Sequence, residues 1–231
     1  MYKLLLLLFA VSLSVLNANI LQEAIDNAAE GSILKLKAGV YKGGIVINKP
    51  ITIIGMQDGV IIDGENKGTV ITVKSSYVTL KNLKVIKSGD RHEKVDAAIS
   101  LNDSKHCEVS NCIIEDCLFG IDLKMMQNSI ISNNKISSKN FDLGLRGDGI
   151  RVWYSNNNII KANSLIKSRD MVVWYSHGNE IVDNYGEGCR YSLHFMYAGK
   201  NIVKNNHYKH NSVGIFFMYS KDTVASGNVV K

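Results

Sequence analysis

The chain has 231 residues, of which 45% are hydrophobic and 21% are charged, and its formal net charge is +6 at pH 7. One proline and nineteen glycines suit many short strands joined by tight turns, and this balance excludes a disordered linker protein. The lysines are scattered and form no continuous basic stripe. We therefore expect no nucleic-acid partner.

The first eighteen residues have the pattern of a secretory signal peptide. An apolar run from Leu4 to Leu16 is followed by Asn17-Ala18. The run is shorter than the roughly 20 residues that span a bilayer, so a membrane anchor is the weaker alternative. We predict cleavage after Ala18 and an exported mature chain, residues 19–231, that contacts membranes only through partner proteins.

Two kinds of short element are predicted next. Residues 21–29 place apolar side chains at helical spacing before Gly31, which predicts a short helix that covers the open end of the following structure. Brief β-branched runs bounded by turn residues then predict strands at Ile33–Leu36, Ile45–Ile47, Ile51–Ile54 and Val60–Ile62.

An aromatic phrase then occurs four times, as GIRVWYS (149–155), VVWYS (172–176), LHFMYA (193–198) and IFFMYS (215–220). Its tyrosines fall at positions 154, 175, 197 and 219, so the period is 21 or 22 residues. A fixed period of this size indicates a repeat architecture in which each repeat is one coil of a solenoid.

Three apolar columns run through seven coils at this period. The first column is Val70, Ile99, Ile121, Ile150, Met171, Leu193 and Ile215. The second, two residues later, is Thr72, Leu101, Leu123, Val152, Val173, Phe195 and Phe217. The third is Leu80, Val109, Ile131, Ile160, Ile181, Val203 and Ala225. Each column predicts inward-facing core residues stacked from coil to coil.

Two polar ladders accompany the columns. One is Asn134, Asn163, Asn184, Asn206 and Asn228, with Leu83 and Cys112 in the earlier coils, and the other is Ser129, Asn158, Asn179, Asn201 and Thr223. We expect the asparagines to adopt the left-handed backbone of sharp turns and to hydrogen-bond from coil to coil. The predicted fold is therefore all-β, a right-handed single-stranded parallel β-helix with about 22 residues per coil. Extra residues near 87–95 and 138–147 are expected to form outer loops.

Strand alternation also predicts the outer face. One outward column is Ser100, Asp122, Arg151, Val172, His194 and Phe216, and its neighbour is Asn102, Lys124, Trp153, Trp174, Met196 and Met218. The later coils make an apolar strip, which predicts a docking surface. The alternative is that the loop at 138–147 folds over the strip and makes it interior.

Three residues in this strip could bind a metal. His194 and Met196 lie two residues apart on the same side, and Met218 is stacked one coil beyond Met196. Imidazole and thioether ligands together suit Cu(I), which makes these three the candidate copper ligands. The alternative is that the methionines only fill an adaptable surface.

A charged set lies near the starts of the coils, and it contains Arg146, Asp148, Arg151, Arg169, Asp170 and Arg190. We favour salt bridges that orient the longer loop, with partner recognition second and catalysis on a polyanionic sugar third. The predicted partner-binding residues are this set together with Trp153, Trp174 and Phe216. The four cysteines, at 107, 112, 117 and 189, lack metal-type spacing and are expected either to form a disulfide among the first three or to be buried free thiols.

The segments LRGDGIRVWYS (145–155), RDMVVWYS (169–176), RYSLHFMYA (190–198) and VGIFFMYS (213–220) closely resemble the NosD family. The opening segments LQEAIDNAAEGSILKLKAGVY and KPITIIG also look like the first coils of that family. The resemblance covers essentially the whole mature chain. The family normally continues for further coils, so we expect this chain to lack C-terminal coils.

The resemblance implies a periplasmic accessory protein for the maturation of nitrous oxide reductase. Such proteins work with the membrane subunit of an ATP-binding-cassette transporter and with a copper chaperone lipoprotein, so that the copper-sulfide centre of the reductase is assembled. It implies a scaffold without catalytic residues that handles copper. The alternative hypothesis is a β-helix enzyme, a lyase or epimerase of acidic polysaccharides, because many proteins of this fold act on such sugars.

Overall fold

The computed structural model describes residues 5–7 and 19–231. The predicted signal peptide therefore lies outside the described residues, except for the short strand β1 (Leu5–Leu7). Within the described part of the chain, no helix has the length and apolar character needed to cross a bilayer.

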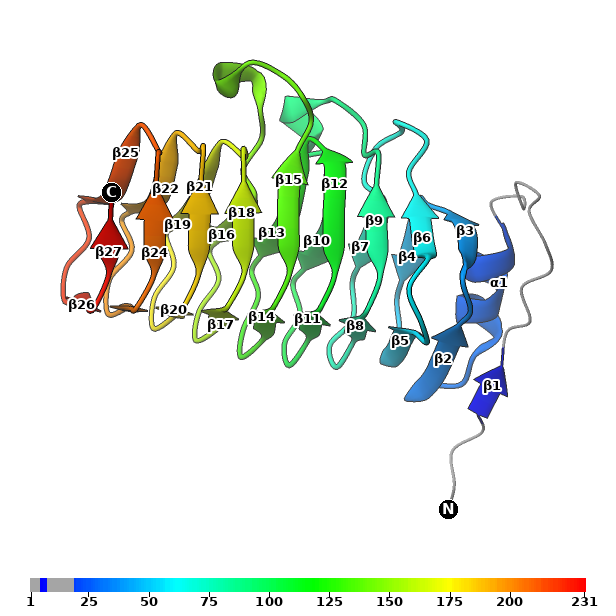
Figure 1. Cartoon of the computed structure of the whole chain (residues 1–231). Helices are drawn as coiled ribbons and strands as arrows, with labels where there is room; N and C mark the ends of the chain where they lie inside the picture. Colours follow the sequence, from blue (N-terminus) through cyan, green and yellow to red (C-terminus); the bar gives the residue numbers. More distant parts are fainter. Residues whose placement is uncertain (1–4, 8–18) are drawn as a thin grey trace.

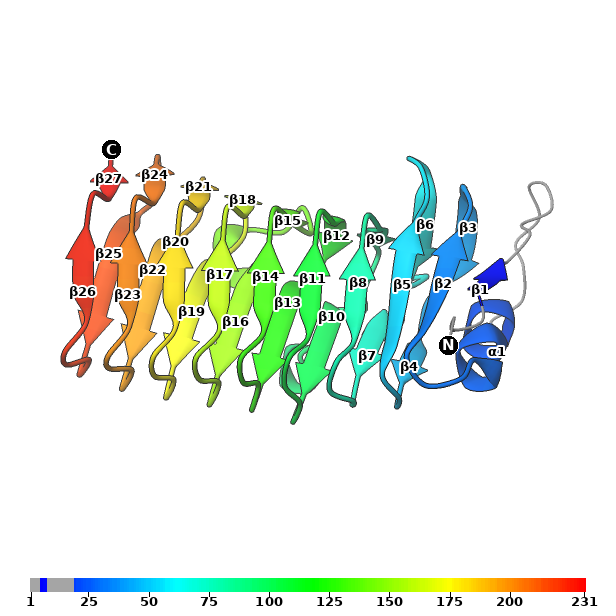
Figure 2. The same cartoon turned by 90° about the horizontal axis from the view of Figure 1, so that it is seen from below.

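The described strands form three parallel sheets that enclose one core (Figures 1 and 2). The first sheet contains β1, β2 (Ser32–Leu36), β5 (Ile51–Gly55), β8 (Thr79–Lys81), β11 (Glu108–Ser110), β14 (Ile130–Ser132), β17 (Ile159–Lys161), β20 (Glu180–Val182), β23 (Ile202–Lys204) and β26 (Val224–Ser226).

The second sheet contains β3 (Gly39–Lys42), β6 (Val60–Asp63), β9 (Lys84–Ile86), β12 (Ile113–Cys117), β15 (Lys135–Ser138), β18 (Ser164–Ile166), β21 (Tyr185–Glu187), β24 (His207–Lys209) and β27 (Val229–Val230). The third sheet contains β4 (Ile45–Ile47), β7 (Ile71–Val73), β10 (Ala97–Asn102), β13 (Phe119–Lys124), β16 (Ile150–Trp153), β19 (Asp170–Trp174), β22 (Tyr191–Met196) and β25 (Val213–Met218).

Each coil from β2 to β25 contributes one strand to each sheet, and β26 and β27 extend the first two sheets. The coils form a right-handed solenoid as the chain advances from α1 to β27 (Figure 1). Right-handed crossovers are the rule for parallel strands because of the twist of L-amino-acid chains. The predicted parallel β-helix with about 22 residues per coil is thus confirmed.

The helix α1 (Asn19–Asn27) covers the end of the solenoid that begins with β2 and β3 (Figure 2). Its apolar side is buried, because Leu21 and Ile25 are at most 2% exposed and belong to the main core cluster. The predicted capping helix is confirmed, although it begins and ends two residues earlier than the apolar spacing indicated. The cap keeps the core of the first coil away from water.

The third column and the later coils of the first two columns have the predicted register. Ile99 pairs with Ile121, Ile121 with Ile150, and Val109 with Ile131. The prediction was wrong in one coil, where Ile71 and Val73 occupy the first two columns in place of Val70 and Thr72. Val70 is also fully buried, but its side chain packs beside Gly43 and Gly64 at the preceding turn.

The asparagine ladders hydrogen-bond from coil to coil as predicted. The Nδ2 atom of each residue from Asn134 to Asn206 donates to Oδ1 of the next ladder asparagine over 2.9–3.1 Å. The predicted left-handed backbone was wrong for these residues, because it belongs to the residue before each of them, such as Ala162 (φ 54°) before Asn163. The carboxamide instead points inward and serves buried backbone groups that would otherwise be unsatisfied.

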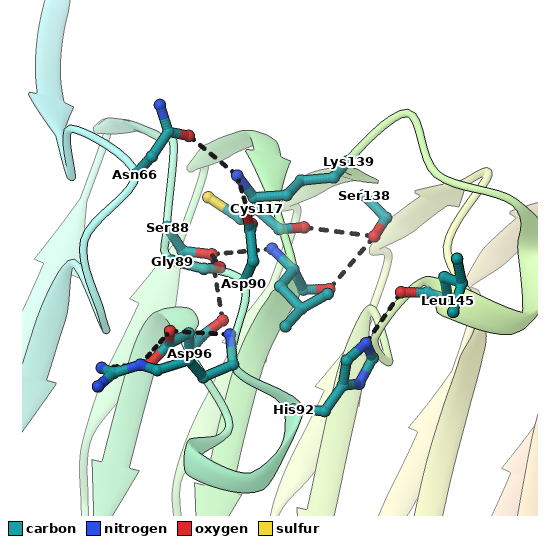
Figure 3. Close-up of polar contacts among 12 residues, drawn as sticks. Asn66, Ser88, Gly89, Asp90, His92, Asp96, Cys117, Ser138, Lys139 and Leu145 are labelled. Atoms are coloured by element: carbon teal, nitrogen blue, oxygen red, sulfur yellow. Dashed lines mark hydrogen bonds and ion pairs between the residues drawn. The ribbon is translucent and has the colours of Figure 1, made fainter.

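Both predicted insertions are loops at the corner between the second and third sheets, where Figure 1 shows them side by side at the top. The first contains the 3₁₀ helix η1 (His92–Lys94) and the second contains η2 (Leu143–Leu145). His92 Nε2 lies 2.9 Å from the carbonyl oxygen of Leu145, so the loops contact each other (Figure 3).

All four cysteines are free thiols that lie buried in the described coils, which decides between the two alternatives left open by the sequence. Burial raises the pKa of Cys112 and of Cys117 to about 12 and that of Cys189 to about 11. The thiols are therefore protonated and unreactive in the folded protein.

Candidate functional site

The outward residues of the third sheet form the two columns predicted from the repeat. Trp153 pairs with Trp174, Trp174 with Met196, and Met196 with Met218. In the neighbouring column, Val172 pairs with His194. We call the apolar part of this face the aromatic strip, and it consists of Trp153, Trp174, His194, Met196, Phe216 and Met218.

The aromatic strip is only partly exposed. Phe216 is 37% exposed and the two tryptophans and two methionines are intermediate, whereas His194 is 9% exposed. Three rings surround His194: Tyr191 is stacked on it at 4.8 Å between centroids, and Trp174 and Phe216 are each 5.5 Å away. The strip is therefore a closely packed outer layer on the third sheet.

His194 lacks hydrogen bonds although its polar atoms are buried. Neither Nδ1 nor Nε2 of His194 has a hydrogen-bond partner in the described part of the chain, and Nε1 of Trp174 beside it has none either. Burial lowers the pKa of His194, so the ring is neutral at pH 7. A neutral imidazole with a free lone pair can bind a metal ion. A buried imidazole that binds neither a metal ion nor a hydrogen-bond partner lowers the stability of the folded state.

The residues present fit Cu(I) better than a harder metal. Among the described residues, no group of three or more His, Cys, Asp or Glu side chains is placed to hold a metal ion. His194 and Met196 lie on the outer side of the same strand, and Met218 is the neighbour of Met196 in the next coil. Imidazole and thioether donors of this kind favour Cu(I). These three residues remain the predicted copper ligands.

A column of stacked tyrosines borders the strip, and the sequence analysis used these residues only to measure the period. Tyr154, Tyr175, Tyr197 and Tyr219 stack with ring centroids 4.9–5.3 Å apart and interplanar angles of 6–11°. Each has a left-handed backbone with φ between 47° and 52°, which directs the ring outward at the turn after its strand. The recurrence of tyrosine at the same turn position in successive coils was the sequence signal that could have revealed this column.

The charged set forms salt bridges, as favoured from the sequence. Asp148 accepts a hydrogen bond from Arg169 Nε at 3.0 Å, and Asp170 is paired with Arg190. Both carboxylates are at most 2% exposed. Arg146 donates from Nε to the carbonyl oxygen of Phe141 over 2.8 Å, which holds the second inserted loop.

Arg151 is held in two ways. Its Nη1 atom lies 2.7 Å from Oδ1 of Asp122, and its guanidinium lies 4.4 Å from the centroid of the Trp153 ring. The salt bridges of the charged set leave no pair of unengaged carboxylates of the kind that glycoside-cleaving enzymes use.

The fold defines the class as a parallel β-helix protein, and solved structures of that class are similar. A rice weevil pectin methyl esterase aligns with a TM-score of 0.63 and 12% identity, covering 97% of this chain and 92% of that one. An alginate lyase from Paenibacillus sp. str. FPU-7 aligns with a TM-score of 0.55 and 14% identity, covering 92% and 97%. These similarities concern the fold alone.

A Dettilon tailspike protein also aligns, with a TM-score of 0.56 and 13% identity, covering 78% of this chain. The chain spans 44% of the length of that protein. No curated protein sequence matches the chain significantly.

Residues 133–231 match the family model described as "Periplasmic copper-binding protein (NosD)". The match confirms the resemblance to the NosD family over these residues. The segment contains all four aromatic phrases, the whole aromatic strip and the tyrosine column.

Proposed function

We propose that this protein is a periplasmic accessory scaffold for assembly of the copper-sulfide centre of nitrous oxide reductase. The aromatic strip carries the proposal, because it lies within the segment that matches the copper-binding family and contains a buried imidazole without a hydrogen-bond partner. Copper is the cargo in this role, and the protein works without catalysing a reaction.

The proposed ligands of Cu(I) are His194, Met196 and Met218. The buried His194 ring is neutral, so no proton has to leave before its nitrogen binds the ion. The thioethers are soft and uncharged, which suits Cu(I) and allows release to a site with stronger ligands. Exposure of His194 is small, so the ion is expected to reach it from the side of Met196 and Met218.

The proposed partners are the membrane subunit of an ATP-binding-cassette transporter, a copper chaperone lipoprotein and the reductase itself. The exposed parts of the strip and the tyrosine column offer rigid aromatic surface, which is the chemistry enriched at protein interfaces. We propose that Trp153, Trp174 and Phe216 contact a partner and that Arg146, Asp148, Arg151, Arg169, Asp170 and Arg190 position the neighbouring loop for it. We propose that export by the predicted signal peptide brings the protein into the periplasm together with these partners.

Anaerobic titration with Cu(I) tests the cargo role. The variant His194→Ala, Met196→Leu, Met218→Leu is expected to lose one bound Cu(I) per chain. A control changes one histidine and two methionines outside the strip, as His207→Ala, Met56→Leu, Met125→Leu. It should bind like the wild type, because these side chains are exposed away from the strip, with His207 on the second sheet and the two methionines on earlier coils. Equal stoichiometry and affinity in all three proteins would refute the copper site.

Binding to the purified transporter tests the docking role separately. The variant Trp153→Ser, Trp174→Ser should bind the transporter more weakly, whereas Tyr77→Ser, which removes an exposed aromatic ring from an early coil, should not. Undiminished binding of the tryptophan variant would refute docking through the strip while leaving the copper result intact.

A further inference from the structure

A groove of about 410 Å³ lies on the outer side of the third sheet, over the coils that precede the aromatic strip. Outward side chains of β7, β10 and β13 line its floor, including Thr72, Ser100 and Asp122. Lys94 and Val95 of the first inserted loop form one wall, and Trp153 closes one end. The sequence analysis placed Ser100 and Asp122 on the outer face but gave them no functional role.

The floor of the groove is an ordered polar network. Ser100 donates from its hydroxyl to Oδ2 of Asp122 over 3.2 Å, and Asn102 donates from Nδ2 to the Ser100 hydroxyl over 3.0 Å. Arg151 binds the other oxygen of Asp122. The network fixes these side chains before a ligand arrives.

The charge of the groove favours an anion. Its lining includes three cationic side chains, Lys94, Lys124 and Arg151, against the single carboxylate of Asp122, which Arg151 already neutralises. The two lysines are exposed, and their flexible side chains can reach a bound group. The partly exposed Trp153 side chain lies at the end of this positive region, with the Arg151 guanidinium 4.4 Å from its ring centroid.

Hydrogen bonds and an ion pair hold the inserted loop that forms this wall (Figure 3). Asp96 is 2% exposed and binds Arg91 with both oxygens, to Nε at 3.0 Å and to Nη2 at 3.1 Å. Ser88 donates to the carbonyl oxygen of Asp96 over 3.1 Å. These contacts hold Val95 at φ 54°, a left-handed conformation that is unusual for a β-branched residue and that is retained where the surroundings impose it.

The second inserted loop braces the first. Lys139 is 5% exposed in its side chain, and its Nζ contacts Asp90 at 2.9 Å and Asn66 Oδ1 at 2.9 Å (Figure 3). Together with the contact between His92 and Leu145, the contacts of Lys139 hold the first inserted loop in position relative to the third sheet. A preformed wall lowers the entropy cost of binding.

The donors and acceptors in the groove are side chains, because the backbone of these strands is committed to neighbouring coils. An extended peptide binds best to a free strand edge, which the middle of a continuous sheet does not offer. Hydroxyl, carboxamide and guanidinium groups beside an indole ring match the alternating hydroxyls and apolar ring faces of a sugar. We propose that this groove binds a short acidic oligosaccharide, with sugar carboxylates at Lys94 and Lys124 and apolar C–H groups of the sugar against the exposed part of the Trp153 side chain.

The proposal concerns binding of such a sugar. Glycoside hydrolysis uses two carboxylates, whereas this lining contains Asp122 alone, held by Arg151. The proposal is independent of the copper role, because the groove and the candidate copper ligands share no residue. A surface glycan or a free uronic-acid oligomer could supply the same chemistry.

The test uses the full chain with Trp174→Phe, which leaves Trp153 as the only tryptophan and the reporter of the groove. Titration with a galacturonate trisaccharide should change its fluorescence saturably, whereas the uncharged sugar maltotriose and the acidic peptide triglutamate should bind at least about tenfold more weakly. Comparison of the trisaccharide with polymeric pectate separates a free oligomer from a glycan surface as the source.

Paired lysine variants in the same background complete the test. Lys94→Ala, Lys124→Ala should weaken trisaccharide binding about tenfold or more, because each lost ammonium removes a charged hydrogen bond. The control Lys135→Ala, Lys161→Ala removes two exposed lysines from the other sheets and should change nothing. The proposal is overturned if the trisaccharide fails to bind, if both lysine pairs give the same affinity, or if triglutamate or maltotriose binds as tightly as the trisaccharide.

Discussion

Asn163 offers the sharpest test of how the coils are held together. Its carboxamide makes four hydrogen bonds inside the ladder. Nδ2 donates to the carbonyl oxygen of Ile131 at 2.9 Å and to Oδ1 of Asn184 at 3.1 Å. Oδ1 accepts from the backbone N–H of Asn134 at 3.1 Å and from its Nδ2 at 2.9 Å. The substitution Asn163→Ala removes all four.

The expected loss follows from these bonds. Each contributes about 1 kcal/mol net, and the buried groups left without partners add to the cost, so Asn163→Ala should lower the free energy of unfolding by about 4 kcal/mol. That is a large part of the total stability of roughly 5–15 kcal/mol that natural domains have. Asn228→Ala should cost less than half as much, because Asn228 is only partly buried and water can replace its bonds.

Urea unfolding followed by far-ultraviolet circular dichroism measures these differences. Asn140→Ala, at an exposed loop position, should stay within about 0.5 kcal/mol of the wild type. The double variant Asn163→Ala, Asn184→Ala should cost less than the sum of the single variants, since the two residues share bonds. A loss below about 1.5 kcal/mol for Asn163→Ala, or an equal loss for Asn228→Ala, would refute the reasoning.

Three further predictions concern titration, close packing and thiol reactivity. Burial raises the pKa of Asp148 to about 6 from 3.8, so the folded state holds its proton more tightly than the unfolded state does. The free energy of unfolding should therefore fall by up to about 3 kcal/mol as pH rises from about 4 to about 6, and this fall should be absent in Asp148→Asn, as acid-range urea titrations would show. Gly120→Ala should destabilise the protein by about 3 kcal/mol, because a methyl group there would lie 2.2 Å from the carbonyl oxygen of Gly149. Gly144→Ala should be neutral, since nothing lies within 4 Å of a methyl group at that position. Equal melting temperatures of the two variants would contradict this prediction. A thiol reagent should label the native protein hardly at all and the urea-unfolded protein four times, and fast labelling of the native chain would show that the thiols are not buried at Cys107, Cys112, Cys117 and Cys189.

The period of the aromatic phrase was enough to predict the solenoid and most of its register. Stacked coils repeat one environment, so a residue in one coil reports on its counterparts in the next. The predicted register was wrong at Val70 because Val70 and Ile71 are both apolar and both buried. The alternation of apolar and polar residues therefore could not show which of the two lies in the core column. The strand β3 was missed because it begins at Gly39 and has an exposed valine at position 40.

The candidate sites were predictable only in part. Strand alternation placed His194 and Val172 on the outer side, but it could not reveal that both are buried, since burial depends on how neighbouring rings lean. The groove was not predicted, because one of its walls comes from Lys94 and Val95 in an irregular loop whose position no repeat specifies. The conformation of such a loop is decided by long-range contacts such as that of Lys139 with Asn66.

The three corners of the solenoid differ in how much chain they accept. From β7 to β26 every turn from the third to the first sheet has five residues, such as 154–158, and from β8 to β27 every turn from the first to the second sheet has two, such as 162–163. The turn from the second to the third sheet ranges from one residue (118) to eleven (139–149). The two fixed corners are those closed by the polar ladders, whose bonds require equal spacing in every coil. The remaining corner can accept insertions of different lengths, because no ladder fixes its spacing. Inserted segments there can extend over the third sheet without changing the register of the coils.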